Sequence, residues 1–418
     1  PYGSMRHFFV VIDLTDRCDT FSWSSTLRID ATSFRGHRPD AWIIQTCLTG
    51  ARQNTWNTRP IINTQPTTTG NNLIIGAGLA GCTLAWRLQQ AGQPFHLVGS
   101  SQLPGAAKVA AGIINPVTGR WMTKSWRFDD FAPEAADFYR AIEKQFFLKL
   151  YHPLSAVRFC LNAEDAKRAR RRSRNPRYGN VINALEAAGS ERTSFKNPHG
   201  KLSISGAAYV DLPLLIETLR THFQTTGDYE DSGFAYQNLT QREGGWIYDG
   251  HAYERVFCCE GAALGRNPWF GHLPLTPAKG ETLLCRSEDL QLDQKLYHHG
   301  KWLLPYPDGT FRIGATYDED DLSPGATEAA KKQLSQAFET MTQAAHTLRI
   351  LDQPAGIRPS TSDARPFLGA HRTEPGLYVF NGLGSKGASL APTLSRELID
   401  FTFNGAPLDP ETDIRRFL

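Results

Sequence analysis

From residue 71 onward, short apolar runs alternate with segments that have a helical period. Leu73-Ile74-Ile75 is an apolar run that ends in glycine, residues 79–90 have a helical period, and residues 94–98 form a second apolar run. A strand, a turn, a helix and a second strand within about 30 residues are what a βαβ unit requires. The pattern therefore predicts an α/β fold that begins near residue 71.

The rest of the chain adds helices and short strands, whereas its first 70 residues fit neither pattern. Helical period predicts helices over 132–150, 212–223, 327–348 and 396–403, with Asp211 before Pro213 as a start signal for the second. Short alternating runs separated by turn signals predict antiparallel strands within 274–317. Residues 1–70 are rich in Thr, Arg, Asn and Trp and keep no period, so we expect an unstructured or poorly packed leader, with a partner-binding arm as the alternative.

Composition narrows the class of protein. The 418 residues are 40% hydrophobic and carry a formal net charge of +3, which allows a large core and favours neither nucleic acid nor an acidic ligand. Seven scattered cysteines contain no C-x-x-C pair, so neither a zinc ribbon nor a dithiol redox centre is expected, and a reducing, cytoplasmic setting fits best. No apolar run approaches the ~20 residues of a membrane helix. We expect no metal site, because the histidines show no ligand spacing.

The residues Gly76-Ala77-Gly78-Leu79-Ala80-Gly81 form a G-x-G-x-x-G motif where a dinucleotide fold needs it. Gly76 permits the turn out of the strand, Gly78 lets the backbone approach a pyrophosphate, and Gly81 lets helix and strand pack closely. The helix N-terminus then faces the phosphates with its partial positive charge. The motif lies directly after an apolar strand and opens a helix, which strengthens the prediction that it binds a dinucleotide. A glycine-rich turn without a ligand is the alternative.

One element of the dinucleotide pattern is missing. The second strand of such folds normally ends with an acidic residue that holds the ribose hydroxyls. Here Val98 is followed by Gly99-Ser100-Ser101. Ser100 or Ser101 can offer a hydrogen bond to the ribose, although a neutral hydroxyl is a weaker clamp than a carboxylate.

Four ordered blocks of sequence identify a family. After the glycine motif come Ala110-Ala111-Gly112-Ile113-Ile114-Asn115-Pro116, then residues 297–316, which end in Phe311-Arg312-Ile313-Gly314-Ala315-Thr316. The last block is Gly356-Ile357-Arg358-Pro359 with Gly382-Leu383-Gly384-Ser385-Lys386-Gly387. From about residue 71 to its C-terminus the chain resembles the D-amino-acid oxidase superfamily of FAD enzymes. It is most similar to the glycine oxidases and to the oxidase module of bifunctional tRNA-modifying enzymes that process carboxymethylaminomethyl-uridine.

The resemblance implies an α/β fold with a Rossmann-like FAD-binding domain of the glutathione-reductase type and an inserted, mostly antiparallel substrate domain. We place the FAD-binding domain at 71–155, 203–274 and 354–418, and the substrate domain at 156–202 and 275–353. FAD is expected to be held non-covalently. The expected contacts beyond the glycine motif are Ser100, Ala110, Ala111, Gly112, Gly261, Gly382, Gly384, Ser385, Lys386 and Gly387.

Three residues are the catalytic candidates. In the resembling enzymes the Arg of the G-x-R-P block pairs with the substrate carboxylate, and here it is Arg358; an arginine that bonds backbone carbonyls is the alternative. Lys386 is expected to stabilise the reduced flavin, with a solvated loop lysine as the alternative. Trp302 falls where glycine oxidases have a tyrosine of the pocket wall, with a core aromatic as the alternative. Ser385 replaces a pocket arginine of that group, so glycine itself is not a secure substrate and a secondary amine fits as well.

The expected reaction is hydride transfer from the α-carbon of a small amine or amino acid to flavin N5, followed by hydrolysis of the imine. The sequence does not decide between dioxygen and another electron acceptor. The basic run of residues 167–174 is a solvated helix face or loop in the favoured interpretation, and a footprint for RNA phosphates in the other. A tRNA-modifying oxidase and a flavin-binding scaffold without turnover therefore stay open as alternative functions.

Overall fold

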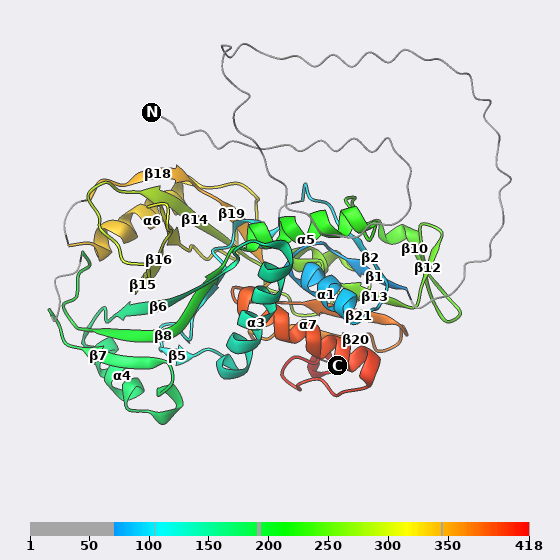
Figure 1. Cartoon of the computed structure of the whole chain (residues 1–418), viewed down its shortest axis with the longest axis horizontal. Helices are drawn as coiled ribbons and strands as arrows, with labels where there is room; N and C mark the ends of the chain where they lie inside the picture. Colours follow the sequence, from blue (N-terminus) through cyan, green and yellow to red (C-terminus); the bar gives the residue numbers. More distant parts are fainter. Residues whose placement is uncertain (1–70, 104, 190–193, 344–345, 418) are drawn as a thin grey trace, which may run out of the picture. The chain divides into compact units, whose positions relative to one another are not determined.

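The computed structural model describes residues 71–103, 105–189, 194–343 and 346–417. The leader predicted for residues 1–70 lies outside the described residues. Within the described part, two large sheets carry the fold (Figure 1). The α/β fold class predicted from the sequence is confirmed.

The first sheet has six strands in the order β20-β21-β13-β1-β2-β9. All neighbours are parallel except β20 and β21. The strands are β1 (Asn72–Ile75), β2 (Phe95–Val98), β9 (Tyr229–Glu230), β13 (Arg255–Cys258), β20 (Phe367–Ala370) and β21 (Leu377–Asn381). Because successive side chains of a strand point to opposite faces, Ile74 packs in the same core as helix α1, whereas Leu73 and Ile75 pack with Trp246 of the small sheet β10-β11-β12.

Three helices accompany the first sheet: α1 (Leu79–Gln90) contacts both α5 (Leu212–Thr226) and α7 (Gly387–Asn404). The sequence predicts α1 to the residue. Asp211 starts α5 as expected, because its side chain accepts a hydrogen bond from the backbone N–H of Leu214 at 3.0 Å. The small sheet consists of β10 (Leu239–Arg242), β11 (Gly245–Tyr248) and β12 (His251–Tyr253).

The second sheet has ten strands, of which eight follow the order β18-β14-β17-β16-β15-β6-β8-β3, while β19 pairs with β14 and β7 with β8. Its pairs are antiparallel except β6 with β15. This confirms the antiparallel strands expected within 274–317. The strands are β3 (Ile113–Ile114), β6 (Tyr151–Phe159), β7 (Ile182–Glu186), β8 (Lys201–Val210), β14 (Ala278–Arg286), β15 (Lys295–His299), β16 (Lys301–Pro305), β17 (Phe311–Gly314), β18 (Arg349–Asp352) and β19 (Ala355–Arg358).

Two expected helices end earlier than the periodicity predicts. Helix α3 (Phe128–Phe146) begins before residue 132 and stops at Phe147, whose backbone is left-handed at φ 53°. Helix α6 (Glu328–Met341) stops at Thr342, which is extended at ψ 150°, instead of running to residue 348. In both places the apolar pattern continues into a following strand, so its period overestimates the length of the helix. The domain boundaries stay a prediction; residues 203–210 pair within the ten-stranded sheet as part of β8.

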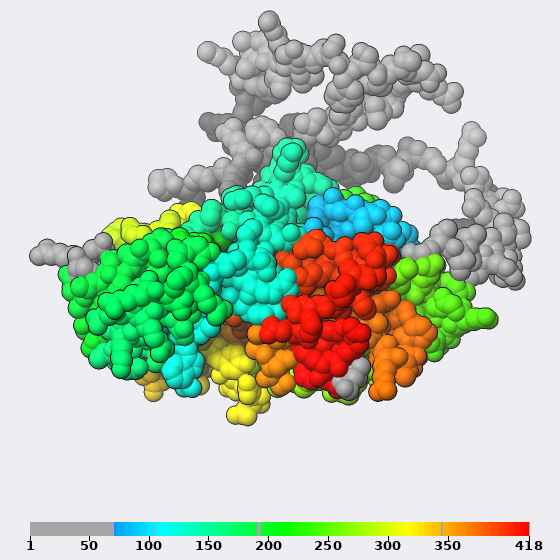
Figure 2. Space-filling view, turned by 90° about the horizontal axis from the view of Figure 1, so that it is seen from below, coloured from blue at the N-terminus to red at the C-terminus, as the bar shows by residue number. Residues whose placement is uncertain are grey.

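The C-terminal segment packs against a segment from the first third of the chain. Figure 2 shows residues of α7 and beyond (red) beside the cyan segment that leads into α3. There Arg127 forms ion pairs with Glu397 at 2.8 Å and with Asp409 at 2.9 Å. None of the described helices combines the length and apolar character that crossing a membrane demands.

Candidate active site

The glycine motif adopts the geometry of a phosphate-binding turn. A β-carbon on Gly76 would be 2.6 Å from the carbonyl oxygen of Cys259, and one on Gly81 would be 1.9 Å from that of Gly76. Both glycines therefore allow contacts that a side chain would prevent. Gly78 has nothing within 4 Å of its β-position, so space is open in front of the turn. No side chain caps the first turn of α1, which leaves its N–H groups free to bind phosphate oxygens.

A second helix N-terminus lies beside the first. A β-carbon on Gly387, the first residue of α7, would be 2.8 Å from the Cδ2 of Leu79, the first residue of α1. No side chain caps α7 either. Gly384, with a left-handed φ of 52°, donates its N–H to the carbonyl of Pro359 at 3.1 Å and so joins this loop to the G-x-R-P block. Two uncapped helix ends together favour negative charge.

The small-residue block also reaches this region. It follows the short helix α2 (Ala106–Val109), and Ala110 leaves that helix with an extended backbone. A β-carbon on Gly356 would be 2.5 Å from the Cγ2 of Val109, while Arg312 donates to the carbonyl of Val109 at 3.1 Å. Gly112, at φ 61°, leaves no room for a side chain, since a β-carbon would be 1.9 Å from the carbonyl oxygen of Val210. All four sequence blocks are thus brought together.

Arg358 is partly buried on β19. It donates through Nη1 to the carbonyl of Lys279 at 3.2 Å and through Nη2 to that of Thr316 at 3.1 Å. Burial lowers the pKa of its guanidinium, and among the described residues it forms no ion pair. Burial, and then the charge of Arg358, lower the pKa of the Lys301 amine, which donates to the carbonyl of Ala315 at 2.7 Å. Two cations without a carboxylate partner among the described residues make this place favourable for an anion.

The remaining candidates occupy distinct places. Trp302, on β16, is partly buried with its indole against Gly314, whose β-position is 2.5 Å from the Cζ2 of Trp302. Lys386 is partly buried, and burial lowers the pKa of its amine; it forms no ion pair within the described part of the chain. Ser385 is exposed. Gly261, at φ 59°, follows β13 and accepts a hydrogen bond from Asn381 at 3.1 Å.

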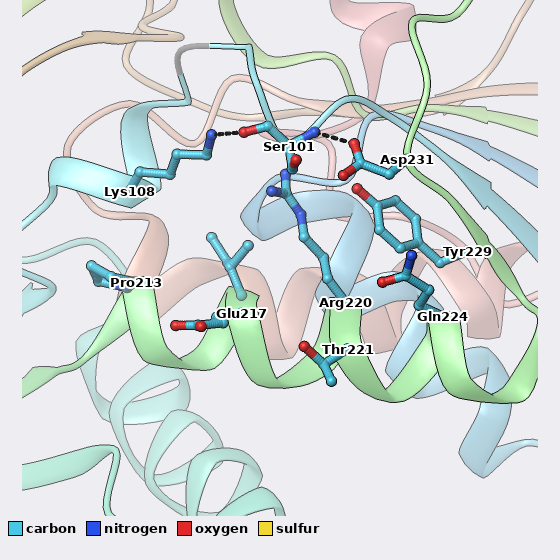
Figure 3. Close-up of a pocket in the computed structure, with 10 residues that line it drawn as sticks. Ser101, Lys108, Pro213, Glu217, Arg220, Thr221, Gln224, Tyr229 and Asp231 are labelled. Carbon is cyan, nitrogen blue, oxygen red and sulfur yellow. Dashed lines mark hydrogen bonds between the residues drawn. The ribbon is translucent and has the colours of Figure 1, made fainter. Parts of the chain in front are cut away.

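Several residues beside the glycine turn belong to no local motif, so the sequence alone does not place them there. Arg220, on α5, donates through Nε to the carbonyl of Ala77 in the glycine turn at 2.8 Å. Figure 3 shows Arg220 extending from α5 toward Ser101 and Lys108, beside a pocket of about 340 Å³. Asp231 accepts from the backbone N–H of Ser101 at 2.5 Å. These contacts join segments 130 or more residues apart, so no local motif announces them.

Glu260 introduces a carboxyl beside the glycine turn. Its Cα is 3.1 Å from the β-position of Gly76, and its Oε2 accepts from Nδ2 of Asn267 at 2.8 Å. Burial raises the pKa of this carboxyl to about 7, partly opposed by the Asn267 hydrogen bond. The Glu260 carboxyl is therefore protonated to a higher pH than an exposed glutamate is.

The basic run lies on helix α4 (Ala163–Ser173) and has two faces. Arg168 and Arg172 turn inward and donate to the carbonyls of Arg120 at 3.1 Å and Trp121 at 3.2 Å. The outward face consists of the exposed residues Lys167, Arg170, Arg171 and Arg174, at helical spacing. Trp121 beside it is 54% exposed, and the guanidinium of Arg168 lies 4.8 Å from its ring centroid.

Taken together, the turn fits a dinucleotide: Gly78 faces open space, two uncapped helix ends lie together, and nearby cations have no acidic partner among the described residues. Residues 72–401 match the family described as FAD dependent oxidoreductase. The chain belongs to this family. It is therefore an FAD-dependent oxidoreductase, as the sequence blocks imply.

Relatives within the family differ in length. The chain is 26% identical over 366 residues to a tRNA 5-methylaminomethyl-2-thiouridine biosynthesis bifunctional protein of Marinobacter nauticus; the match covers 82% of this chain and 56% of that protein. The chain thus spans about half the length of this relative. It is 24% identical to a glycine oxidase of Pseudomonas aeruginosa, over 81% of this chain and 96% of the relative.

Solved structures share the fold of the described part. An iminodiacetate oxidase from Chelativorans sp. BNC1 and a glycine oxidase from Geobacillus kaustophilus each superpose with a TM-score of 0.69 at 20% identity. Each match covers 82% of this chain and 98% of the other. This likeness supports the FAD-dependent oxidase fold, with its mixed and antiparallel sheets.

Proposed function

We propose that the protein binds FAD non-covalently and oxidises a small amine or amino acid that carries a carboxylate. The observation that carries this proposal is the pair of cations Arg358 and Lys301, held by backbone carbonyls and without an acidic partner among the described residues. Lys301 and Arg358 belong to the third and fourth sequence blocks, and the fourth block contacts the start of α1 through Gly387 and Leu79. Glycine oxidase and iminodiacetate oxidase, named above, both act on amines that carry carboxylates.

Arg358 anchors the substrate in this proposal. A guanidinium has five N–H donors, and the carbonyls of Lys279 and Thr316 account for two of them. The remaining donors suit a carboxylate, and their rigid fork fixes the α-carbon in one orientation. Lys301 adds positive charge, so an amine with a second carboxylate is also favoured.

The residues of the chain orient the reactants, and the cofactor provides the redox step. When bound, FAD supplies the acceptor for the hydride that leaves the α-carbon of the neutral amine. Loss of the hydride would leave an iminium ion; loss of its N–H proton to water gives the imine, which water hydrolyses to a carbonyl compound and a free amine. Trp302 forms an apolar wall, while Lys386 and the N-terminus of α7 favour negative charge on the reduced flavin.

The deciding experiment is an anaerobic absorbance titration of the purified protein with glycine, sarcosine, proline, D-amino acids and iminodiacetate. We expect a flavin spectrum that one of these compounds bleaches. Arg358→Met is expected to weaken that bleaching, and Arg349→Met, an exposed arginine on β18, is the matched control. A flavin that no amine bleaches contradicts the proposal. Where an amine does bleach the flavin, formation of hydrogen peroxide in air distinguishes dioxygen from an electron carrier as the acceptor.

A second candidate is oxidation of an amine carried on tRNA, favoured by the outward face of α4 together with the exposed Trp121. Phosphates pair with clustered cations, and bases stack on aromatic rings. Log affinity for tRNA falls as log salt rises. Changing the four outward residues to Gln is expected to make this slope less steep by about 3. The control changes four exposed cations elsewhere: Lys144, Lys332, Arg349 and Arg372. Equal losses in both variants, or binding to anionic vesicles instead of tRNA, contradict this candidate.

A further inference from the structure

Strand β2 ends without an acidic residue because the structure leaves no room for one. A β-carbon on Gly99, the residue after the strand, would be 2.5 Å from the backbone nitrogen of Ala77 and 3.1 Å from its Cβ. The backbone after β2 thus lies against the glycine turn, and Tyr229 holds it there by donating to the carbonyl of Gly99 at 2.7 Å. Any side chain at Gly99 would displace one of these segments.

The neighbouring strand ends with an acidic residue at the same level. Strand β9 pairs in parallel with β2, and Val98 is the partner of Glu230, so Asp231 follows β9 beside Gly99. In Figure 3, Asp231 lies next to Ser101, and its carboxylate accepts a hydrogen bond from the backbone N–H of Ser101 at 2.5 Å. Hydrogen bonds from the side chain and then the backbone of Ser101 lower the pKa of Asp231. The group is therefore an ionised, exposed carboxylate at the carboxyl edge of the sheet.

We propose that Asp231 supplies the carboxylate that binds the ribose hydroxyls of the adenosine half of the cofactor, in place of the acidic residue that β2 lacks. This inference rests on the proposed binding of FAD. Ribose hydroxyls in dinucleotide folds are held by a carboxylate at this edge of the sheet, and the adjacent strand is the nearest place from which one can come when β2 offers none.

The carboxylate has capacity for this role. Two carboxylate oxygens offer about four acceptor sites, and the backbone N–H and side chain of Ser101, together with the hydroxyl of Tyr229, occupy at most three of them. Lys108 and Arg220 line the same pocket of about 340 Å³ and add positive charge, yet neither forms an ion pair with Asp231. The carboxylate is thus kept ionised without being saturated.

The adjacent acidic residue provides a matched control. Successive side chains of a strand point to opposite faces. Glu230 accordingly turns away from the pocket, with its Oε2 3.6 Å from Nε2 of His96 and its Oε1 accepting from the hydroxyl of Ser232 at 2.5 Å. It is one residue away from Asp231 and has the same charge, but different contacts.

The test measures the FAD dissociation constant of the apoprotein by quenching of flavin fluorescence. Loss of a hydrogen bond to a charged group should weaken FAD binding by about 10- to 100-fold in Asp231→Asn and Asp231→Ala, and Glu230→Gln should leave it unchanged. A second titration uses an FAD analogue whose adenosine ribose lacks both hydroxyls. Removing the hydroxyls should weaken binding to the wild type and have little effect on binding to the Asp231 variants.

The outcomes separate this assignment from the proposed function. If the Asp231 substitutions weaken the affinity for FAD and for the dideoxy analogue by the same factor, Asp231 merely supports the loop and the assignment is wrong. If the wild type binds FAD and Asp231→Asn binds it equally well, the assignment fails and the proposed function stands. If the wild type binds no flavin, the proposed function fails, and the assignment fails with it.

Discussion

The guanidinium of Arg358 lies on the backbone of Gly280. A β-carbon on Gly280 would be 1.9 Å from Nη2 and 2.1 Å from Cζ of Arg358. Gly280 lies on β14 opposite Gly356 of β19, two residues before Arg358 on the same strand. The absence of a side chain at Gly280 therefore sets the position of the residue proposed to hold the substrate.

Replacing Gly280 by alanine should move Arg358 without changing its chemistry. The clash involves the far end of a flexible side chain, so we expect the fold and FAD binding to persist. The KM for a carboxylate substrate should rise about 10- to 100-fold, as for a lost charge-assisted hydrogen bond. Steady-state kinetics measure the effect. Gly325→Ala, where nothing lies within 4 Å of the β-position, is the control; an unchanged KM in Gly280→Ala would refute the role of Arg358.

Two glycines of the phosphate turn should respond differently to alanine. At Gly78 the added methyl group meets no protein atom, so Gly78→Ala should fold normally and lose affinity for FAD. At Gly81 it would be 1.9 Å from the carbonyl oxygen of Gly76, which should lower the free energy of unfolding by roughly 3 kcal/mol. Urea unfolding and FAD titration separate the two effects. Equal destabilisation of both variants would contradict this division.

The Glu260 carboxyl should make the stability of the apoprotein depend on pH. Burial raises its pKa from 4.5 to about 7. Between these values the carboxyl is ionised in the unfolded chain and still protonated in the folded one, so its contribution to stability falls as pH rises. The penalty is absent below pH 4.5 and complete above pH 7, where it is at most about 3 kcal/mol.

Glu260→Gln should remove that penalty, because an amide does not ionise and still accepts the hydrogen bond from Asn267. The variant should match the wild type in urea unfolding near pH 4.5 and exceed it at pH 8. A wild type and variant whose free energies of unfolding run parallel from pH 4.5 to pH 8 would show that Glu260 does not titrate in this range.

Arg220 should matter for the shape of the cofactor turn. Its Nε and Nη2 both donate to the carbonyl oxygen of Ala77. Arg220→Lys keeps the charge and loses the planar fork, so we expect FAD affinity to fall about tenfold. Thr221→Ser, at a neighbouring position of α5 on the same pocket, is the control. If Lys substitutes without loss, positive charge alone accounts for the contribution of Arg220.

The sequence predicts the parts of this site that depend on local geometry. The G-x-G-x-x-G turn and helix 79–90 follow from neighbouring residues, because the glycines fix both the turn and the start of the helix. Family resemblance implied only that Leu79 and Gly387 both contact the cofactor. Their contact with each other comes from the structure, since no local rule relates residues so far apart.

Other parts depend on strand order, which periodicity does not reveal. Asp231 matters because β9 pairs with β2, and Arg220 because α5 passes the glycine turn. The missing acid after Val98 was visible in the sequence; the reason for it, the contact between Gly99 and Ala77, was not. The ends of α3 and α6 were misjudged because apolar period alone does not show where the backbone leaves the helical region.

The order of strands in the six-stranded sheet has a consequence for biosynthesis. Strand β1 begins at residue 72, yet its neighbours are β2 and β13, and β13 in turn pairs with β21 near residue 377. Pairings between segments so distant must close long loops, which slows folding. On the ribosome β1 and β2 can pair with each other early, but their outer neighbours β13 and β9, and then β21 and β20, are made much later. The sheet that carries the glycine turn is therefore complete only once β20 and β21, at residues 367–381, have been synthesised.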